Sequence, residues 1–157
     1  MGMNESKGNM YEFVTHTWNS IKGKCPHDCS YCYMKRWGAL KDTRLDEKEL
    51  KADLGSGNFI FVGSSCDMFA QDIPASWIER TLGHCHDFAK NRYLLQSKNP
   101  KGIIEKGLGF IPENSVLCTT IESNRFYPEV MGRSPPPEER AYFMSKLVIF
   151  DRYVTIE

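Results

Sequence analysis

The most informative short stretch for the architecture is Phe59-Ile60-Phe61-Val62-Gly63, an apolar run that ends at a glycine. An apolar run without alternation is typical of a strand that is buried on both faces, as in parallel sheets. Working outward along the chain, we expect further strands at residues 13–18, 93–95, 116–121 and 153–156. The repeated pattern predicts a sheet of mainly parallel strands.

Amphipathic segments lie between these strands. We expect a helix over residues 76–90, whose buried face carries Ile78, Leu82, Cys85 and Ala89, and shorter helices near 45–54 and 103–107. Ser134 is placed to cap a further helix that runs to Leu147 through three prolines and two acidic residues. Strand then helix at roughly 30-residue spacing predicts βα units and an α/β fold.

The chain length limits how much of a barrel can form. A complete eight-unit β/α barrel needs about 250 residues, and the chain has 157. We therefore predict a single domain over residues 1–157, a partial β/α barrel of about four and a half units. The sequence ends at Glu157 inside a strand-like run, which predicts an unpaired sheet edge. A truncated chain, a natural minimal protein and a homodimer that pairs its edges remain open alternatives.

Composition excludes several classes of protein. With 41% hydrophobic and 25% charged residues, the chain has the make-up of an ordinary globular domain. Its formal net charge of zero argues against a polyanion binder that works by bulk charge. No apolar run is long enough to span a bilayer, and the N-terminal residues lack a secretory signal. We expect a cytoplasmic protein without a membrane segment.

A group of basic residues flanks the cysteine-rich segment and is interleaved with aromatic ones. The group comprises Lys22, Lys24, Lys35, Arg36, Lys41 and Arg44, with Tyr33 and Trp37 among them. Such a group is able to contact a nucleic-acid backbone and to stack bases. Solvated surface charge is the alternative, and the zero net charge favours it.

The segment Cys25-Pro26-His27-Asp28-Cys29-Ser30-Tyr31-Cys32-Tyr33 carries three of the six cysteines. Clustered cysteines in a reducing compartment usually bind metal or do redox chemistry. Thiolates suit zinc, copper(I) and iron–sulfur clusters. A four-iron cluster held by three cysteines keeps one iron open to a small molecule. A structural zinc site with His27 as fourth ligand is the alternative, but its cysteines usually come in separate pairs.

The cysteine spacing resembles the C-x-x-x-C-x-aromatic-C motif of the radical S-adenosylmethionine (radical SAM) superfamily, with Tyr31 at the aromatic position. Further segments resemble a phage-associated branch that has distant similarity to spore photoproduct lyase. They are Thr17-Trp18-Asn19, Cys32-Tyr33, Phe61-Val62-Gly63-Ser64-Ser65, Leu94-Leu95-Gln96-Ser97-Lys98 and Thr155-Ile156-Glu157.

The resemblance implies a radical enzyme with two cofactors. Cys25, Cys29 and Cys32 would hold a 4Fe–4S cluster, and S-adenosylmethionine would chelate its open iron. Reductive cleavage would then give a 5′-deoxyadenosyl radical that abstracts hydrogen from a substrate, with flavodoxin or ferredoxin as electron donor. The substrate is open, and the branch favours nucleic acid or a nucleotide. A non-catalytic iron–sulfur or zinc-binding module is the alternative function.

The resemblance also implies which residues contact S-adenosylmethionine. Tyr31 and the backbone at Tyr33 would lie against the adenine. Many family members end the second strand in Gly-Gly-Glu, where this chain has Gly63-Ser64-Ser65, so a serine hydroxyl or Asp67 would bind the amino group. The remaining candidates are Ser97 and Lys98 for the methionine carboxylate, Thr120 and Glu122 for the ribose, and Arg125 for a carboxylate or phosphate.

The other cysteines lack the spacing of a second cluster. Buried packing is the default expectation for Cys66, Cys85 and Cys118. Cys66 is the exception, because it follows the second strand, where the active face should lie. His84 and His86 flank Cys85, but positions two apart on a helix point away from each other, so we expect a structural role.

Overall fold

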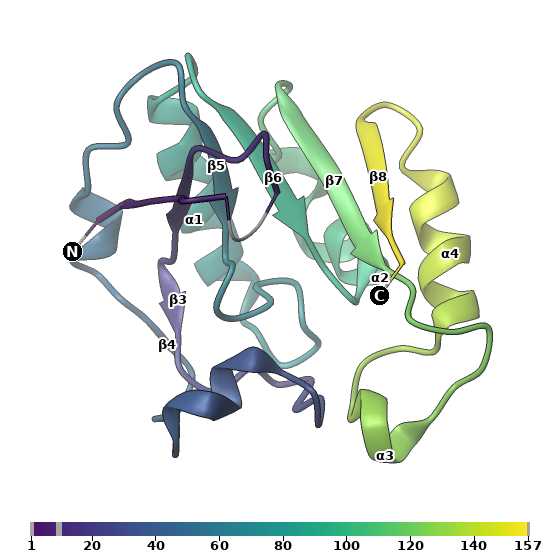
Figure 1. Cartoon of the computed structure of the whole chain (residues 1–157). Helices are drawn as coiled ribbons and strands as arrows, with labels where there is room; N and C mark the ends of the chain where they lie inside the picture. The colour runs from purple at the N-terminus through teal and green to yellow at the C-terminus, as the bar shows by residue number, and fades with distance from the viewer. Residues whose placement is uncertain (1, 9–10, 157) are drawn as a thin grey trace.

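The structure, a computed structural model, describes residues 2–8 and 11–156, so Glu157 lies outside the described residues (Figure 1). Within the described part, the centre is a six-stranded sheet in the order β1-β2-β5-β6-β7-β8. The β1–β2 pair is antiparallel and the other pairs are parallel. The prediction of an α/β fold with a mainly parallel sheet is confirmed.

The six strands of this sheet include the five expected from the sequence, with ends shifted by up to three residues, and one, the first along the chain, that was not predicted. They are β1 (Asn4–Glu5), β2 (His16–Trp18), β5 (Phe59–Val62), β6 (Arg92–Gln96), β7 (Ser115–Thr120) and β8 (Asp151–Thr155). A separate antiparallel pair is formed by β3 (Ile21–Lys22) and β4 (Arg44–Leu45).

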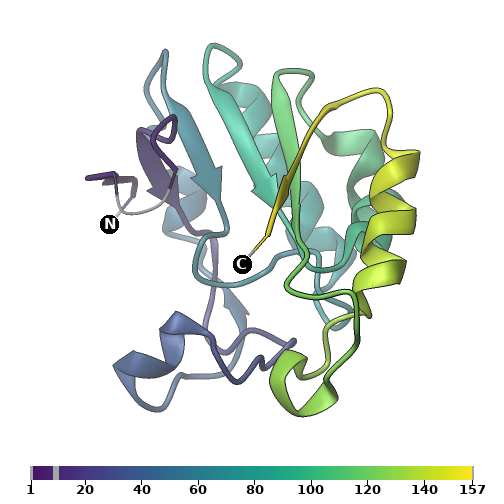
Figure 2. The same cartoon turned by 45° about the vertical axis from the view of Figure 1, so that its right-hand side comes forward.

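The α-helices connect successive strands from β5 onward. All but the third lie on one face of the sheet, and the third lies beyond the carboxyl ends of the strands (Figure 2). The α-helices are α1 (Ala75–Asp87), α2 (Pro100–Gly102), α3 (Pro128–Met131) and α4 (Pro137–Lys146). The π-helical turn is η3 (Ile103–Gly107), and the 3-10 turns are η1 (Tyr33–Trp37), η2 (Glu49–Lys51) and η4 (Leu108–Phe110). Among the described residues, no helix is long and apolar enough to cross a bilayer.

The prediction of a helix near residues 45–54 is wrong. The region contains the end of β4 and the single turn η2. Asp46 forms a local turn here: its carboxylate accepts from the backbone N–H of Lys48 and from Lys22 Nζ. Such a local side-chain turn competes with helix formation. The connection from β2 to β5 therefore has no regular helix, and the count of four and a half units is not confirmed.

Ser134 does not cap α4, which corrects a second expectation. The helix begins at Pro137, and the residue before it, Pro136, offers no side-chain cap. The Ser134 hydroxyl instead donates to the Met131 carbonyl at 2.7 Å and accepts from Arg140 Nη2 at 2.9 Å. Ser134 thus connects the loop before α4 to the helix interior.

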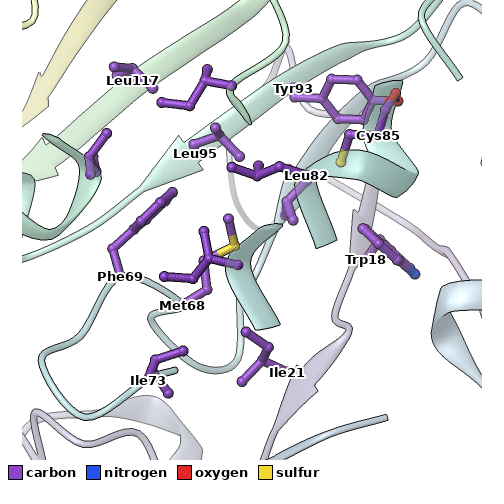
Figure 3. Packing of buried hydrophobic residues seen from close by; sticks show 14 of the residues in the cluster. Trp18, Ile21, Met68, Phe69, Ile73, Leu82, Cys85, Tyr93, Leu95 and Leu117 are labelled. Carbon is purple, nitrogen blue, oxygen red and sulfur yellow. Dashed lines mark hydrogen bonds between the residues drawn. The ribbon is translucent and has the colours of Figure 1, made fainter. Parts of the chain in front are cut away.

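The main core lies between the sheet and α1 (Figure 3). Ile78, Leu82 and Cys85 of α1 are fully buried there, as predicted, whereas Ala89 lies beyond the helix end. Successive residues of the central strands bury opposite faces: Leu95 joins this main core and Leu94 joins a smaller cluster on the other face. This two-sided burial explains the continuous apolar runs.

His84 and His86 have the structural roles expected of them. His84 Nε2 hydrogen-bonds the Ala52 carbonyl at 2.8 Å and its ring packs on Trp18. His86 Nε2 hydrogen-bonds the Phe110 carbonyl at 2.8 Å. The two rings therefore contact different segments of the chain.

Candidate functional site

A cavity of about 430 Å³ opens at the carboxyl ends of the parallel strands. The segments that carry η1 and α3 lie beyond the strand arrowheads in Figure 1. The cavity is lined by Cys25, Cys29 and Cys32 and by these further predicted residues: Tyr31, Tyr33, Gly63, Ser64, Ser65, Asp67, Ser97, Lys98 and Thr120. Residues from four separate segments therefore share one cavity, as expected where βα loops converge.

The cysteine loop is held in place by the segment around α3. Val130 accepts from the backbone N–H of Ser30 at 2.9 Å, and the His27 carbonyl accepts from the backbone N–H of Arg133 at 2.7 Å. Gly132 has a φ of 60°, and a Cβ there would lie 2.2 Å from the His27 carbonyl oxygen. The loop conformation thus depends on residues about a hundred positions downstream, and only glycine fits at the closest approach.

The cysteine thiols differ in exposure. Cys29 is buried and donates to the Met131 carbonyl at 3.4 Å, whereas Cys25 and Cys32 are partly exposed. A hydrogen bond from Cys66 lowers the pKa of the Cys25 thiol to about 6, and the same contact together with burial raises the pKa of Cys66. Burial also raises the pKa of Cys29. The Cys25 thiol is therefore more readily ionised than an ordinary cysteine, and the thiolate is the form that binds metal.

The described residues contain no group of three Cys, His, Asp or Glu side chains that is close enough to hold a single metal ion. A zinc ion needs its donors within about 2.3 Å of one centre. A four-iron cluster takes each cysteine on a different iron, so its thiolates do not converge on one point.

Asp67 is a junction between the cysteine loop and the end of β6. Its Oδ2 accepts from His27 Nε2 at 2.8 Å, from the Ser97 hydroxyl at 2.9 Å and from the Lys98 backbone at 2.8 Å. Its Oδ1 accepts from the backbone N–H of Phe69 at 3.0 Å. Burial alone would raise the pKa of Asp67, but His27 and these donors hold it below its usual value. Burial likewise opposes the charge on His27, and Asp67 overcomes it to raise the pKa of His27.

The serines after β5 are organised by Asn19, a residue to which the sequence assigned no role. Asn19 Oδ1 accepts from the Ser65 backbone at 2.9 Å and from the Ser65 hydroxyl at 3.0 Å. Asn19 Nδ2 donates to the Ser64 hydroxyl at 3.1 Å, and the Tyr33 phenol donates to the Ser64 carbonyl at 2.8 Å. Asn19 is the polar residue directly after β2, and this position is the feature of the sequence that could have identified it.

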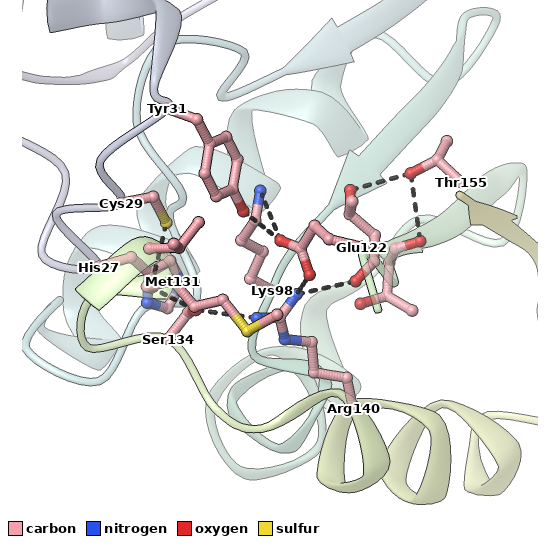
Figure 4. A network of polar contacts seen from close by, with 12 residues as sticks. His27, Cys29, Tyr31, Lys98, Glu122, Met131, Ser134, Arg140 and Thr155 are labelled. Atoms are coloured by element: carbon pink, nitrogen blue, oxygen red, sulfur yellow. Dashed lines mark hydrogen bonds and ion pairs between the residues drawn. The ribbon is translucent and has the colours of Figure 1, made fainter. Parts of the chain in front are cut away.

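Glu122 brings together charged and polar groups beside the cavity, although it does not itself line it (Figure 4). Its Oε1 accepts from the Tyr31 phenol and lies 3.6 Å from Lys98 Nζ. Lys98 Nζ in turn lies 5.0 Å from the centre of the Tyr31 ring. Burial and the contact with Glu122 raise the pKa of Tyr31. Burial opposes ionisation of Glu122, but the surrounding donors and cations hold its pKa below its usual value.

Arg140 is fully buried and anchors Glu122 from behind. Its Nη1 donates to Glu122 Oε2 at 2.6 Å and to the Thr120 carbonyl at 2.9 Å, and its Nε donates to the Pro135 carbonyl at 2.7 Å. No sequence signal identified Arg140, because an arginine on an amphipathic helix is ordinarily exposed.

Thr120 belongs to a polar row across the strand ends. Its hydroxyl accepts from Gln96 Nε2 at 2.8 Å and shares a 2.9 Å hydrogen bond with the Thr155 hydroxyl. Tyr11 donates to Gln96 Oε1 at 2.9 Å and extends the row. Arg125, by contrast, is exposed and does not line the cavity.

Part of the basic group is neutralised by nearby acids. Lys22 pairs with Glu49 at 2.7 Å, and Lys24 and Lys35 pair with Asp28 at 3.3 and 3.0 Å. Trp37 is 77% exposed. These ion pairs are in line with solvated surface charge at three of the six basic positions.

Comparison with known proteins finds solved structures that have a similar fold. No protein-family model and no curated protein matches the chain. A structure of spore photoproduct lyase complexed with dinucleoside spore photoproduct matches with a TM-score of 0.69 and 13% identity, over 98% of this chain and 47% of that chain. A lyase mutant matches with a TM-score of 0.64 and 13% identity, over 99% and 48% of the two chains.

A third lyase structure, a double mutant with bound AdoMet and dinucleoside spore photoproduct, has a TM-score of 0.63 and 12% identity, over 97% of this chain and 46% of that one. The chain thus spans about half the length of the solved structures that it matches. Its fold is similar to that half of spore photoproduct lyase, which is a radical SAM enzyme.

Proposed function

We propose that the chain is a radical SAM enzyme that binds a 4Fe–4S cluster through Cys25, Cys29 and Cys32. One observation carries the proposal: the three cysteines of the loop line the same cavity as the carboxyl ends of β5, β6 and β7. The shared fold with spore photoproduct lyase supports it. So does the donor chemistry, since thiolates are the usual ligands of iron–sulfur clusters.

The cofactors supply the radical chemistry: when bound and reduced, the cluster and S-adenosylmethionine yield a 5′-deoxyadenosyl radical that takes a hydrogen atom from substrate. The residues of the chain bind and orient. Tyr31 and Tyr33 offer aromatic rings beside the cysteines for the adenine, and their phenols are already hydrogen-bonded to Glu122 and Ser64. Each ring is therefore held before a ligand arrives, which lowers the cost of binding.

Charged and hydroxyl groups complete the proposed binding site. Lys98 offers an ammonium group that is suited to the methionine carboxylate. The neighbouring Ser97 hydroxyl donates to Asp67 and holds that carboxylate in place. Ser64 and Ser65 stand at the place of the family's amino-group ligand, with Gly63 making the turn before them. Thr120 and Glu122 offer oxygens on the far side for the ribose. Arg125 would reach a ligand only at the cavity rim.

The proposed substrate is a nucleotide or nucleic acid. The structure with the highest TM-score reported above is a lyase bound to a dinucleoside, and the cations of Arg36, Lys41 and Arg44 near the cysteine loop suit phosphates. A flavodoxin or ferredoxin would supply the electron. β8 is an edge strand of the described sheet, and pairing of two copies through it is a further proposal.

A second candidate, a non-catalytic iron–sulfur module, is favoured by one observation. Asp67, the carboxylate nearest the place where relatives carry a glutamate, already accepts four hydrogen bonds. If no other group binds the amino group of S-adenosylmethionine, the cluster would remain without its co-substrate. The two candidates differ in their response to S-adenosylmethionine.

Anaerobic reconstitution tests both candidates. The protein is loaded with iron and sulfide and reduced, and its electron paramagnetic resonance (EPR) spectrum is recorded with and without S-adenosylmethionine while 5′-deoxyadenosine is assayed. If the chain is a radical SAM enzyme, S-adenosylmethionine changes the cluster signal and 5′-deoxyadenosine is formed. An unchanged signal favours the non-catalytic module. One tightly bound zinc and no iron would contradict both, as would a Cys29→Ala variant that keeps its full iron content.

A further inference from the structure

Exposed aromatic side chains lie near the mouth of the cavity, on two segments of the chain. Trp37 is 77% exposed and ends η1, the turn that follows the cysteine loop. Phe126 and Tyr127 are 41% and 40% exposed and directly precede α3. Both η1 and α3 lie at the end of the molecule beyond the carboxyl ends of the strands (Figure 1 and Figure 2). Several large aromatic side chains at one end of a molecule indicate an interaction surface.

The two segments that carry these rings are joined to each other. The Val130 carbonyl accepts from the backbone N–H of Ser30 at 2.9 Å and from the Ser30 hydroxyl at 3.1 Å. The backbone N–H of Arg133 donates to the His27 carbonyl at 2.7 Å. Aromatic residues that are about ninety positions apart in the sequence are therefore carried by one hydrogen-bonded unit.

Positive charge is concentrated in this unit, although the formal net charge of the whole chain is zero. Residues 23–43 and 121–136 contain six Lys or Arg and four Asp or Glu. One of these acids, Glu122, is neutralised by the buried Arg140, which lies outside both segments. In the described part of the chain, three of the six cations form no ion pair: Arg36, Lys41 and Arg125.

The exposed surface leads directly to the cavity. Met34 and Leu40 line the cavity. Arg36 and Trp37, which lie between them in the sequence, are exposed and are not among the lining residues. One short segment therefore has a side that faces the cavity and a side that faces solvent.

This combination of groups suits a single-stranded nucleic acid better than a duplex. Exposed aromatic rings stack on unpaired bases while nearby cations follow the phosphate backbone. The bases of a duplex are stacked on one another, so Trp37 would meet no free base face. The small excess of positive charge would also give a duplex few phosphate contacts. A base that reacts inside a cavity must in any case leave its stack.

We propose that the outer surface of residues 23–43 and 121–136 binds a single-stranded nucleic acid and presents one of its nucleotides to the cavity. Trp37 stacks on a base, and Arg36 contacts the phosphate backbone. Phe126 and Tyr127 offer further aromatic faces on the second segment. The inference rests on the proposed function for the chemistry inside the cavity, and it adds the form in which the substrate arrives.

The first test measures stacking. A fluorescein-labelled deoxythymidine oligomer is titrated with the reconstituted protein, without S-adenosylmethionine, and binding is followed by fluorescence anisotropy. Trp37→Ala should weaken binding by about fivefold or more, the loss expected for one stacked base. Trp37→Phe should keep most of the affinity, because it retains an aromatic face. Tyr142→Ala is the matched control, since Tyr142 is 57% exposed but lies on α4 and does not line the cavity.

The second test measures phosphate contacts through the salt dependence of the same binding. Arg36→Gln should reduce the slope of log affinity against log salt concentration by about 0.7, the value for one phosphate contact with a single strand. Arg92→Gln is the control, because Arg92 begins β6 at the amino end of that strand and its side chain is 55% exposed. Its slope should equal that of the unmodified protein.

Two unlabelled competitors identify the kind of partner. A duplex of the same length, and polyglutamate as a model of an acidic protein, should both displace the oligomer poorly. Equal displacement by either competitor would overturn the inference, as would equal affinities of Trp37→Ala and Tyr142→Ala. If Trp37→Ala does not fold, tryptophan fluorescence of the unmodified protein decides, since Trp37 is its most exposed tryptophan. Quenching by the unlabelled oligomer supports the inference, and unchanged fluorescence at saturation overturns it.

The inference and the proposed function fail in different ways. A protein that carries its full cluster and does not bind the oligomer would overturn the inference and leave the proposed function intact. A protein that binds the oligomer and assembles no cluster would contradict the proposed function and leave the binding surface.

Discussion

The sheet with its helices and the loops beyond its carboxyl edge are held together by different forces. In the framework, formed by β2, β5 to β8, α1 and α4, burial of apolar side chains on both sheet faces dominates. In the loop layer, defined here as residues 23–43 and 121–136, Cys29 and Met131 alone among the described apolar side chains are buried. The loop layer depends instead on hydrogen bonds to buried charges and to backbone carbonyls.

The difference teaches where rigidity at the cavity comes from. Asp67 and Arg140 each stand at the boundary between the two regions and join the loop layer to a strand end through several hydrogen bonds. A buried charge with several partners costs little while they are present and much when one is removed. The loop layer should therefore be sensitive to single polar substitutions.

The largest effect is expected at Arg140. Arg140→Ala removes the donors to Glu122, Thr120, Pro135 and Ser134 and leaves a carboxylate without its buried partner. We expect the free energy of unfolding to fall by about 4 kcal/mol, within the range for breaking a buried pair. Urea unfolding followed by circular dichroism measures it.

An exposed ion pair provides the matched control for Arg140. Arg80 makes a two-point contact with Glu47 on the surface at 2.5 to 2.6 Å. Arg80→Ala should leave the unfolding midpoint nearly unchanged, because exposed pairs contribute little. Similar losses in the two variants would show that burial is not what makes Arg140 important.

The framework could be predicted from sequence, because apolar burial leaves a periodic trace. The run of residues 59–62 and the stripe Ile78, Leu82 and Cys85 sit as their patterns indicate. The sequence also marked the cysteine loop and the strand ends that share the cavity. What these residues bind stays a prediction.

The contacts that fix the loop layer leave no such trace. Arg140 and Asn19 are single polar residues, and their partners are distant in sequence. The failure at residues 45–54 has a partly similar origin: besides the local turn with Lys48, Asp46 bonds Lys22 across the β3–β4 pair, and no local pattern encodes that second contact.

A somewhat smaller effect is expected at Asp67. Asp67→Asn keeps the shape but replaces one acceptor with an amide donor that faces other donors. We expect a loss of about 3 kcal/mol near pH 6 in the metal-free protein. The measurement is urea unfolding of both proteins across a pH series.

The pH dependence of that loss follows from the two pKa shifts. Folding raises the pKa of His27, so its share of stability is present below about 6.5 and is lost as pH rises through the raised value. Folding lowers the pKa of Asp67, so its share is present above about 3.8 and is lost as pH falls through the lowered value. The difference between the proteins should be largest between these limits. A pH-independent difference would contradict a charged pair.

Gly132 tests whether the loop layer responds to backbone shape as well as to charge. Gly132→Ala places a Cβ against the His27 carbonyl at a φ of 60°. We expect a loss of about 2 kcal/mol from strain, and lower iron content after reconstitution, because the clash displaces the cysteine loop. Gly83→Ala in α1 is the control, since a Cβ there meets nothing within 4 Å and alanine favours helix. Equal iron contents in the two variants would mean that the loop tolerates the shift.

The smallest effect on stability is expected from removing either of two threonine hydroxyls that are adjacent in β7. Thr120 lines the cavity and its hydroxyl bonds Gln96 and Thr155, whereas Thr119, whose hydroxyl donates to the Ser97 carbonyl at 2.7 Å, is not among the lining residues. Thr120→Val and Thr119→Val should each reduce the free energy of unfolding by about 1 kcal/mol, the usual value of one hydrogen bond. Only Thr120→Val should also weaken binding of S-adenosylmethionine to the reconstituted protein, measured by calorimetry. Equal affinities in the two variants would show that Thr120 serves the framework alone and that the ribose is bound elsewhere.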